Sequence, residues 1–210
     1  DTDRSRGLGD VYKRQSIDNV VIPNSVTTIG ENIFGHCTSL KNIIIPDSIT
    51  DISYGTFSDC TNLENIAIPD GVTNIGEYAF YGCENLKNIN IPNGVKSIKE
   101  STFNGCKSLI NITIPEKVTN IGDYAFTDCE SLVSLVIPNS VKKIGHRAFE
   151  NCSALETITI PNSVTSILES AFDGCKNLTI MGYKNSVAEN YAKENEINFI
   201  ELIKKIITGD

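Results

Sequence analysis

The sequence has few of the residues on which catalysis and membrane insertion depend. Its 210 residues contain no tryptophan, one methionine and two histidines. No apolar run approaches the roughly 20 residues that span a bilayer, so we expect no membrane insertion in this segment. The net charge of −8 and the pI near 4.8 argue against nucleic acid and anionic lipid as partners, because both bind a basic face.

What the sequence has instead is a repeat of 23 residues in which proline, cysteine and phenylalanine recur. The prolines are Pro23, Pro46, Pro69, Pro92, Pro115, Pro138 and Pro161, and the cysteines are Cys37, Cys60, Cys83, Cys106, Cys129, Cys152 and Cys175. Seven of the eight phenylalanines, from Phe34 to Phe172, lie three residues before those cysteines. A fixed period of this length indicates a solenoid, whose coils stack on one another without a single central core.

Each unit divides into three sections, of which residues 63–85, LENIAIPDGVTNIGEYAFYGCEN, are an example. The first section predicts a strand with Ile66 and Ile68 pointing inward. Pro69 ends this strand, because proline has no amide proton for a ladder hydrogen bond. The second section, residues 72–76, predicts a short extended or bent run on the opposite side of the coil.

The third section, residues 78–83 in this unit, predicts one helical turn that stops just before the cysteine. Residue types that tolerate a positive φ angle occupy the stopping position in every unit. They are His36, Asp59, Gly82, Gly105, Asp128, Asn151 and Gly174. The same backbone conformation is therefore predicted seven times.

The seven cysteines cannot all pair within the chain, because their number is odd. We expect a column of buried free thiols that act as small apolar side chains. Two alternatives stay open. The first is a disulfide, because neighbouring coils about 4.8 Å apart lie within its reach. The second is a zinc site, which is the weaker alternative because zinc ligands cluster locally, whereas these cysteines recur only once in each unit.

The seven repeats cover residues 16–178. Residues 1–15 do not fit the repeat when it is projected backwards, and they resemble a translated adapter sequence. We therefore expect a leader that is non-native or disordered. Because the first unit starts without a polar cap, we also expect this chain to be a segment of a longer array.

After the repeats, we expect residues 179–202 to form a C-terminal cap of a helix and a strand, followed by a short tail at 203–210. Ser186 and Glu189 match a capping box at the start of the helix, and Asn195 matches a stop. The expected buried face of this helix consists of Val187, Ala188, Tyr191 and Ala192.

The string IPxxVxxIGxxAFxxCxxLxxI resembles the BspA-type leucine-rich repeat, or leucine-rich repeat type 5, of bacterial surface proteins and parasitic protists. The resemblance implies a right-handed leucine-rich-repeat solenoid of the α/β horseshoe class, dominated by β-structure, with short helical turns. It also implies extracellular or cell-surface display and adhesion to host matrix proteins or other cell-surface proteins. Ser53, Lys99 and Leu168 stand where the family pattern has glycine, without disturbing the register.

The outward positions of the first section carry no charge, although 21% of the chain is charged. Two interpretations stay open. Strands prefer such residues, with stacked asparagines sharing hydrogen bonds, or a neutral face binds a partner because charge would impede desolvation. The candidate partner-binding face consists of Asn42, Ile44, Asn65, Ala67, Asn88, Asn90, Asn111, Thr113, Ser134, Val136, Thr157 and Thr159, with Asn19 and Val21 at the same positions of the first unit.

A second stripe is acidic and opens the predicted helical turn. We expect the local dipole to favour a carboxylate there, with calcium binding as the weaker alternative. The stripe consists of Glu31, Glu77, Glu100, Asp123 and Glu169.

No constellation of catalytic residues emerges from the sequence. His36 and His146 lie at different repeat positions nearly five units apart, so we expect His36 to fill a positive-φ position and His146 to lie on the surface. Neither a glycine-rich phosphate loop nor a nucleophile elbow is present. We therefore expect no enzyme, no cofactor and no metal site.

We predict a non-catalytic protein-binding or adhesion module on a cell surface, present as a monomeric segment of its array, with a host matrix or cell-surface protein as partner. The alternative is a structural spacer or scaffold within a larger multidomain surface protein.

Overall fold

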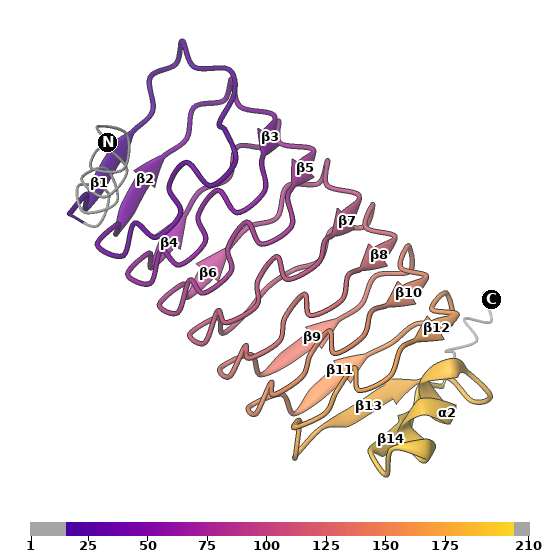
Figure 1. The fold of residues 1–210 in the computed structure, drawn as a ribbon. Coiled ribbons are helices and arrows are strands. Elements are labelled where there is room, and N and C mark those ends of the chain that lie inside the picture. Colours follow the sequence, from indigo (N-terminus) through magenta and orange to yellow (C-terminus); the bar gives the residue numbers. More distant parts are fainter. Residues whose placement is uncertain (1–15, 204–210) are drawn as a thin grey trace, which may run out of the picture.

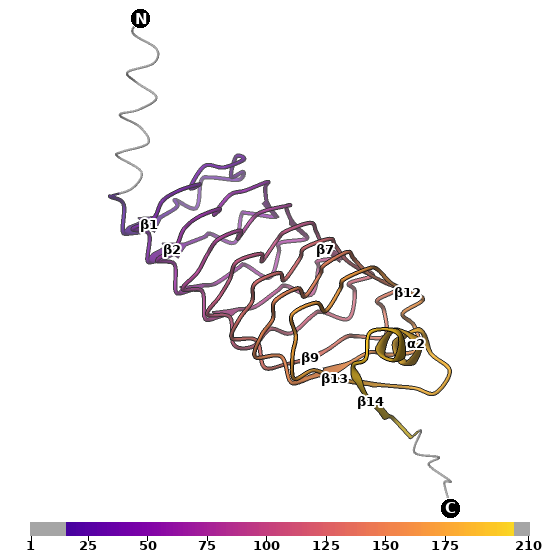
Figure 2. The ribbon, with the colours of Figure 1, turned by 60° about the horizontal axis from the view of Figure 1, so that its bottom comes forward.

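In the computed structural model, the chain forms an elongated solenoid of stacked coils (Figure 1). The structure describes residues 16–203. The leader expected at residues 1–15 and the tail from residue 204 onward lie outside the described residues. Most coils pass through a front strand, a turn after proline, a back strand on the opposite side, and a third section made of turns (Figure 1, Figure 2).

Parallel strands form one row on each of these two sides (Figure 1). The front strands are β1 (Asn19–Val21), β2 (Asn42–Ile44), β4 (Asn65–Ile66), β6 (Asn88–Ile89), β9 (Ser134–Val136), β11 (Thr157–Thr159) and β13 (Thr179–Gly182). The back strands are β3 (Asp51–Ile52), β5 (Asn74–Ile75), β7 (Ser97–Ile98), β8 (Asn120–Ile121), β10 (Lys143–Ile144) and β12 (Ser166–Ile167).

The strands pair in the register of the repeat, so equivalent residues of neighbouring coils lie side by side. Asn19 lies opposite Asn42, and Thr157 lies opposite Ser134. The predicted alternation is confirmed, since Ile66 and Ile68 are only 7% and 5% exposed. A constant register explains why each inward repeat position has the same kind of environment along the array.

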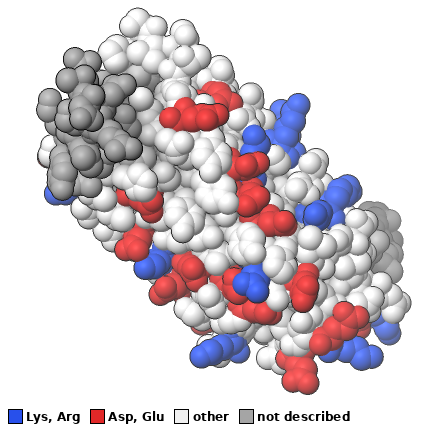
Figure 3. All heavy atoms as spheres, viewed as in Figure 1, with Lys and Arg blue, Asp and Glu red and all other residues white. Residues whose placement is uncertain are grey.

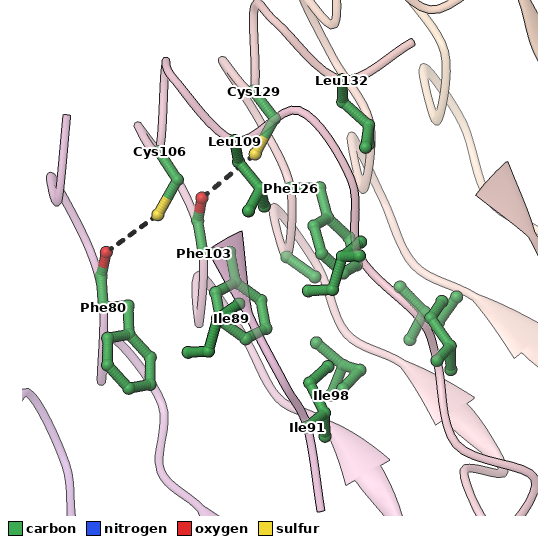
Figure 4. Packing of buried hydrophobic residues seen from close by; sticks show 14 of the residues in the cluster. Phe80, Ile89, Ile91, Ile98, Phe103, Cys106, Leu109, Phe126, Cys129 and Leu132 are labelled. Atoms are coloured by element: carbon green, nitrogen blue, oxygen red, sulfur yellow. Dashed lines mark hydrogen bonds between the residues drawn. The ribbon is translucent and has the colours of Figure 1, made fainter. Parts of the chain in front are cut away.

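The predicted phenylalanines form a continuous column through the interior. The rings of Phe57, Phe80, Phe103, Phe126 and Phe149 are fully buried, and successive rings stack with centroids 5.2–5.6 Å apart. Figure 4 shows three of them beside the inward leucines and isoleucines. Aromatic stacking therefore links each coil to both of its neighbours.

The cysteines form a second buried column of free thiols, as predicted. Their sulfur atoms also have a polar role that the sequence did not reveal. Cys106 Sγ donates a hydrogen bond to the carbonyl of Phe80 in the preceding coil at 3.3 Å, and Cys129 Sγ donates to that of Phe103 at 3.3 Å (Figure 4). Burial raises the pKa of the Cys60 thiol to about 12, so this thiol stays protonated at neutral pH.

The third section differs from the predicted helical turn. In the unit 63–85, the backbone takes positive φ at Tyr78 (57°) as well as at Gly82 (67°). The Cys83 N–H donates to the Phe80 carbonyl of its own coil, whereas the Phe80 N–H donates to the Thr102 carbonyl of the next coil. An α-helix would use all of these amides within its own segment. The helical expectation is therefore wrong here, because alternate amides bind the next coil.

All seven predicted positive-φ positions before the cysteines are confirmed. A second positive-φ position lies four residues earlier in every unit. It is occupied by Asn32, Gly55, Tyr78, Ser101, Tyr124, Arg147 and Ser170. Tyrosine and arginine seldom adopt this conformation, so residue type gave no signal for it.

Within residues 16–203 the one α-helix is α2 (Val187–Glu194). The Ser186 hydroxyl caps it by accepting a hydrogen bond from the Glu189 N–H at 3.2 Å, and Asn195 ends it, as predicted. Ala188, Tyr191 and Ala192 are buried, whereas Val187 is half-buried. The chain then continues into β14 (Asn198–Glu201), which pairs with β13.

Candidate functional site

The fourteen outward positions of the front strands lie on one side of the solenoid, as one surface that we call the front face. Twelve of its side chains are exposed, and Thr157 and Thr159 are half-buried. Three of its apolar side chains are largely exposed to solvent, with Val21 69%, Ile44 62% and Val136 67% exposed. The structure thus brings together the residues that the sequence selected, but it places the two C-terminal threonines partly out of reach.

Side-chain hydrogen bonding along the asparagine positions is confined to one end. Asn42 Nδ2 donates to Asn19 Oδ1 at 3.0 Å, which is the bond predicted for stacked asparagines. Among residues 16–203, the carboxamides of Asn65, Asn88 and Asn111 form no such bond. Their donors and acceptors therefore face the solvent.

A shallow depression of about 440 Å³ lies in the middle of the front face. We call it the central depression, and it is lined by Asn65, Ile66, Ala67, Asn88, Ile89, Asn90, Asn111, Ile112 and Thr113. None of these residues is charged. Ala67 contributes to the hollow because it is the smallest residue among the fourteen outward positions.

Two charged residues adjacent in sequence to the depression are paired across coils. Lys87 Nζ lies 2.8 Å from Glu64 Oε2, and these residues directly precede Asn88 and Asn65. The hydrogen bond from Lys87 lowers the pKa of the Glu64 carboxyl. Both groups are exposed, so the pair contributes little to stability, but each charge is balanced at the margin of the neutral face.

Two members of the acidic stripe have local hydrogen-bond partners, and no helix begins at the stripe. Asp123 Oδ1 accepts a hydrogen bond from the His146 N–H at 2.9 Å, and Glu100 Oε1 accepts one from the Tyr78 hydroxyl at 2.8 Å, which raises the pKa of Tyr78. Since no helix begins there, the dipole explanation is wrong. Acidic side chains occur along the length of the face seen in Figure 3, with basic ones scattered among them.

Among the described residues, no three histidine, cysteine, aspartate or glutamate side chains lie close enough together to hold a metal ion. His36 takes its predicted positive φ of 60° and pairs with Asp59 at 3.1 Å. His146 is half-buried, with its ring edge-on to Tyr124. No helix between residues 16 and 203 is long and apolar enough to cross a membrane.

Two features of the surface had no signal in the sequence. Tyr54 and Tyr81 are 42% and 38% exposed and lie on either side of Tyr78 in ring contact. The asparagines of the central depression also lack the hydrogen bonds that their stacking predicted. Both depend on distances between side chains, which a repeat pattern does not specify.

Stacked coils with parallel strands, inward leucines and isoleucines, and repeated turns define a leucine-rich-repeat solenoid. This chain belongs to the BspA-type family, because the family model described as "BspA type Leucine rich repeat region (6 copies)" matches residues 9–132 and 96–207. No curated protein matches the chain.

Several solved bacterial structures are similar to this chain. The T. pallidum leucine-rich repeat protein is 28% identical with a TM-score of 0.71, over 87% of this chain and 85% of its own. A leucine-rich cell surface protein of Faecalibacterium prausnitzii is 28% identical with a TM-score of 0.56, over 89% of this chain. A leucine-rich repeat protein of Eubacterium ventriosum is 32% identical with a TM-score of 0.66, over 76% of this chain. The chain spans 60% and 43% of the last two.

Proposed function

We propose that this chain is a non-catalytic protein-binding module displayed at a cell surface, and that the front face is its binding surface. The observation that carries the proposal is the absence of charge from fourteen outward positions in a chain that is 21% charged. A partner can cover such a face without stripping water from ions. Exposed apolar residues that recur on one face also favour contact with another protein.

The remaining features support binding rather than chemistry. A stack of similar coils gives an extended surface, which repeat proteins generally use for binding. The thiols are buried in the interior, where they cannot reach a substrate. The family match indicates no enzyme family, and one similar structure is of a protein named as a cell surface protein.

The proposal is tested by placing a single positive charge on or off the front face. Val136→Lys adds it to the face, whereas Ser153→Lys adds it to an exposed position where Lys107 and Lys176 already occupy equivalent sites. Binding of the purified chain and of both variants is measured against a panel of extracellular matrix and cell-surface proteins. We expect Val136→Lys to weaken binding about tenfold or more and Ser153→Lys to leave it unchanged.

Equal binding by both variants and the wild type would exclude the front face as the binding surface. If no protein of the panel binds the wild-type chain, the spacer alternative replaces the proposal.

A further inference from the structure

Backbone hydrogen bonds join neighbouring coils along the front strands, and we call this row of bonds the front ladder. The front ladder is open at the centre of the array, which means that some of its bonds are missing there. Near the two ends, the amide after the second outward residue donates to the next coil. Ile22 N–H donates to Ile44 O at 3.1 Å, Ile137 N–H to Thr159 O at 2.9 Å, and Ile160 N–H to Met181 O at 2.8 Å.

In the central coils, the equivalent bonds are missing from the part of the chain that the structure describes. The amides of Ile45, Ile68, Ile91 and Ile114 donate to no backbone carbonyl. Accordingly, β4 and β6 end one residue earlier than β9 and β11, and Asn111 makes only an isolated bridge to Asn88. The opening runs from Ile45 to Ile114 and includes the central depression.

The central depression therefore has hydrogen-bonding groups without internal partners. Asn65, Asn88, Asn90 and Asn111 each supply a carboxamide, which both donates and accepts, and none of the four hydrogen-bonds within residues 16–203. A backbone peptide group presents the same combination of one donor and one acceptor. This chemistry matches a polypeptide main chain.

The surroundings limit the partner further. No charged residue lines the depression, and Lys87 and Glu64, which directly precede Asn88 and Asn65, pair with each other. The exposed side chains of Ile44 and Val136 flank the depression on the N-terminal and C-terminal sides. These two residues lie four coils apart in the stack, which corresponds to about 19 Å, or about six residues of extended chain.

We propose that the central depression binds an uncharged, extended polypeptide segment of about six residues, which lies along the stack with its main chain over the asparagines and an aliphatic side chain at each end. The inference rests on the proposed function, and it names the part of the partner that the front face recognises. The other candidate ligand is an uncharged sugar chain, whose hydroxyl groups also donate and accept hydrogen bonds. The polypeptide is favoured because no aromatic ring lines the depression on which a sugar could stack.

The test uses an array of acetylated and amidated hexapeptides that vary in charge and in their end residues, probed with the whole 210-residue chain. We expect the strongest binders to lack lysine, arginine, aspartate and glutamate, and to carry valine, isoleucine or leucine at both ends. Methylating the central backbone nitrogens of such a peptide removes its main-chain donors, so we expect about tenfold weaker binding or more.

Variants of the chain locate the contact. Asn88→Asp and Asn90→Asp change only the charge and the donors of a side chain in the depression, and we expect each to weaken peptide binding about tenfold. Asn93→Asp is the matched control in the same coil, because Asp47 and Asp70 occupy its position in other units. We expect Asn93→Asp to bind like the wild type.

The inference is overturned if no peptide of the array binds, if charged peptides bind best, or if N-methylated peptides bind as well as the parent. Stronger binding to a matched array of neutral oligosaccharides also overturns it. Failure of this inference is distinguishable from failure of the proposed function. If Val136→Lys abolishes capture of a protein partner while Asn88→Asp and Asn90→Asp have no effect on it, the front face still binds protein but not by this segment.

Discussion

The front strands of the central coils and those of the C-terminal coils occupy the same place in the repeat but differ in length. β4 and β6 contain two residues each, whereas β9 and β11 contain three. The inward residues of both regions are alike, since Ile66, Ile89, Leu135 and Ile158 are all buried aliphatic side chains. The difference therefore arises on the outside of the coil.

The second outward position shows the contrast. The three-residue strands have Val136 and Thr159 there, whereas the two-residue strands are followed by Ala67 and Asn90. β-branched residues favour strands, and alanine and asparagine do not. Thr113 lies in the same gap and does not follow this pattern. The interior therefore builds the coil, while the outward residues adjust how tightly neighbouring coils pair.

The largest expected effect tests whether the interior is the same in both regions. Phe80→Ala in a central coil and Phe149→Ala in a C-terminal coil each remove a fully buried stacked ring. We expect both to lower the free energy of unfolding by about 3–5 kcal/mol, measured by denaturant unfolding. Costs that differ by more than a factor of two would break the equivalence of the interior.

The thiol column gives the next largest effect, as a loss of stability at alkaline pH. The unfolded state loses the Cys60 proton from about pH 8.5 upward, whereas the folded state keeps it until its pKa of about 12. This contribution is therefore complete below pH 8.5 and falls as pH rises. Between pH 7 and pH 10 we expect the wild type to lose about 2 kcal/mol more stability than Cys60→Ala. Parallel pH profiles of the two proteins would contradict a buried protonated thiol.

Backbone conformation gives a smaller effect. Gly105 has φ of 76°, so Gly105→Ala should cost about 1–2 kcal/mol. Gly105→Asn should cost less, because Asn151 adopts the same conformation in another coil. Thermal unfolding of the two variants provides the measurement, and equal costs would show that the left-handed conformation is not what limits this position.

The smallest effect concerns the length of the front strands. Asn90→Val places a β-branched residue after β6, and we expect it to raise the free energy of unfolding by less than about 1 kcal/mol. The amide of Ile91 should become better protected against hydrogen exchange. If that protection does not change, the residue type at this position does not determine the length of the strand.

Much of the fold could be predicted because a repeat multiplies each signal. The proline positions indicated where each front strand ends, the phenylalanine positions indicated the column of stacked rings, and the cysteine positions indicated the column of thiols. Because the register is fixed, all copies of a position lie at the same place in the coil. The residue types before the cysteines, which are glycine, asparagine, aspartate and histidine, also predicted their positive φ. The predicted helical turn was wrong, because residues 78–83 indicate only which conformation the segment prefers locally. In the structure, alternate amides of this segment bind the next coil instead.

The candidate site could be predicted only in outline. Alternation placed Asn65 and Ala67 outward, as the structure confirms. The central depression lies where the ladder opens, and that depends on distances between coils, which the repeat pattern does not specify. The hydrogen bond between Asn42 and Asn19 shows that the same residue type can pair at one end of the face and stay unpaired at its centre.

Native-state hydrogen exchange of single amides tests the central claim most directly, because it reads the ladder without any partner. The amides of Ile68 and Ile91 lie in the open region, and those of Ile137 and Ile160 lie in the closed one. We predict that the first pair exchanges roughly tenfold faster or more than the second, with both pairs in one folded protein. Equal protection of all four amides would show that the front ladder is continuous, and it would contradict both the central opening and the peptide site built on it.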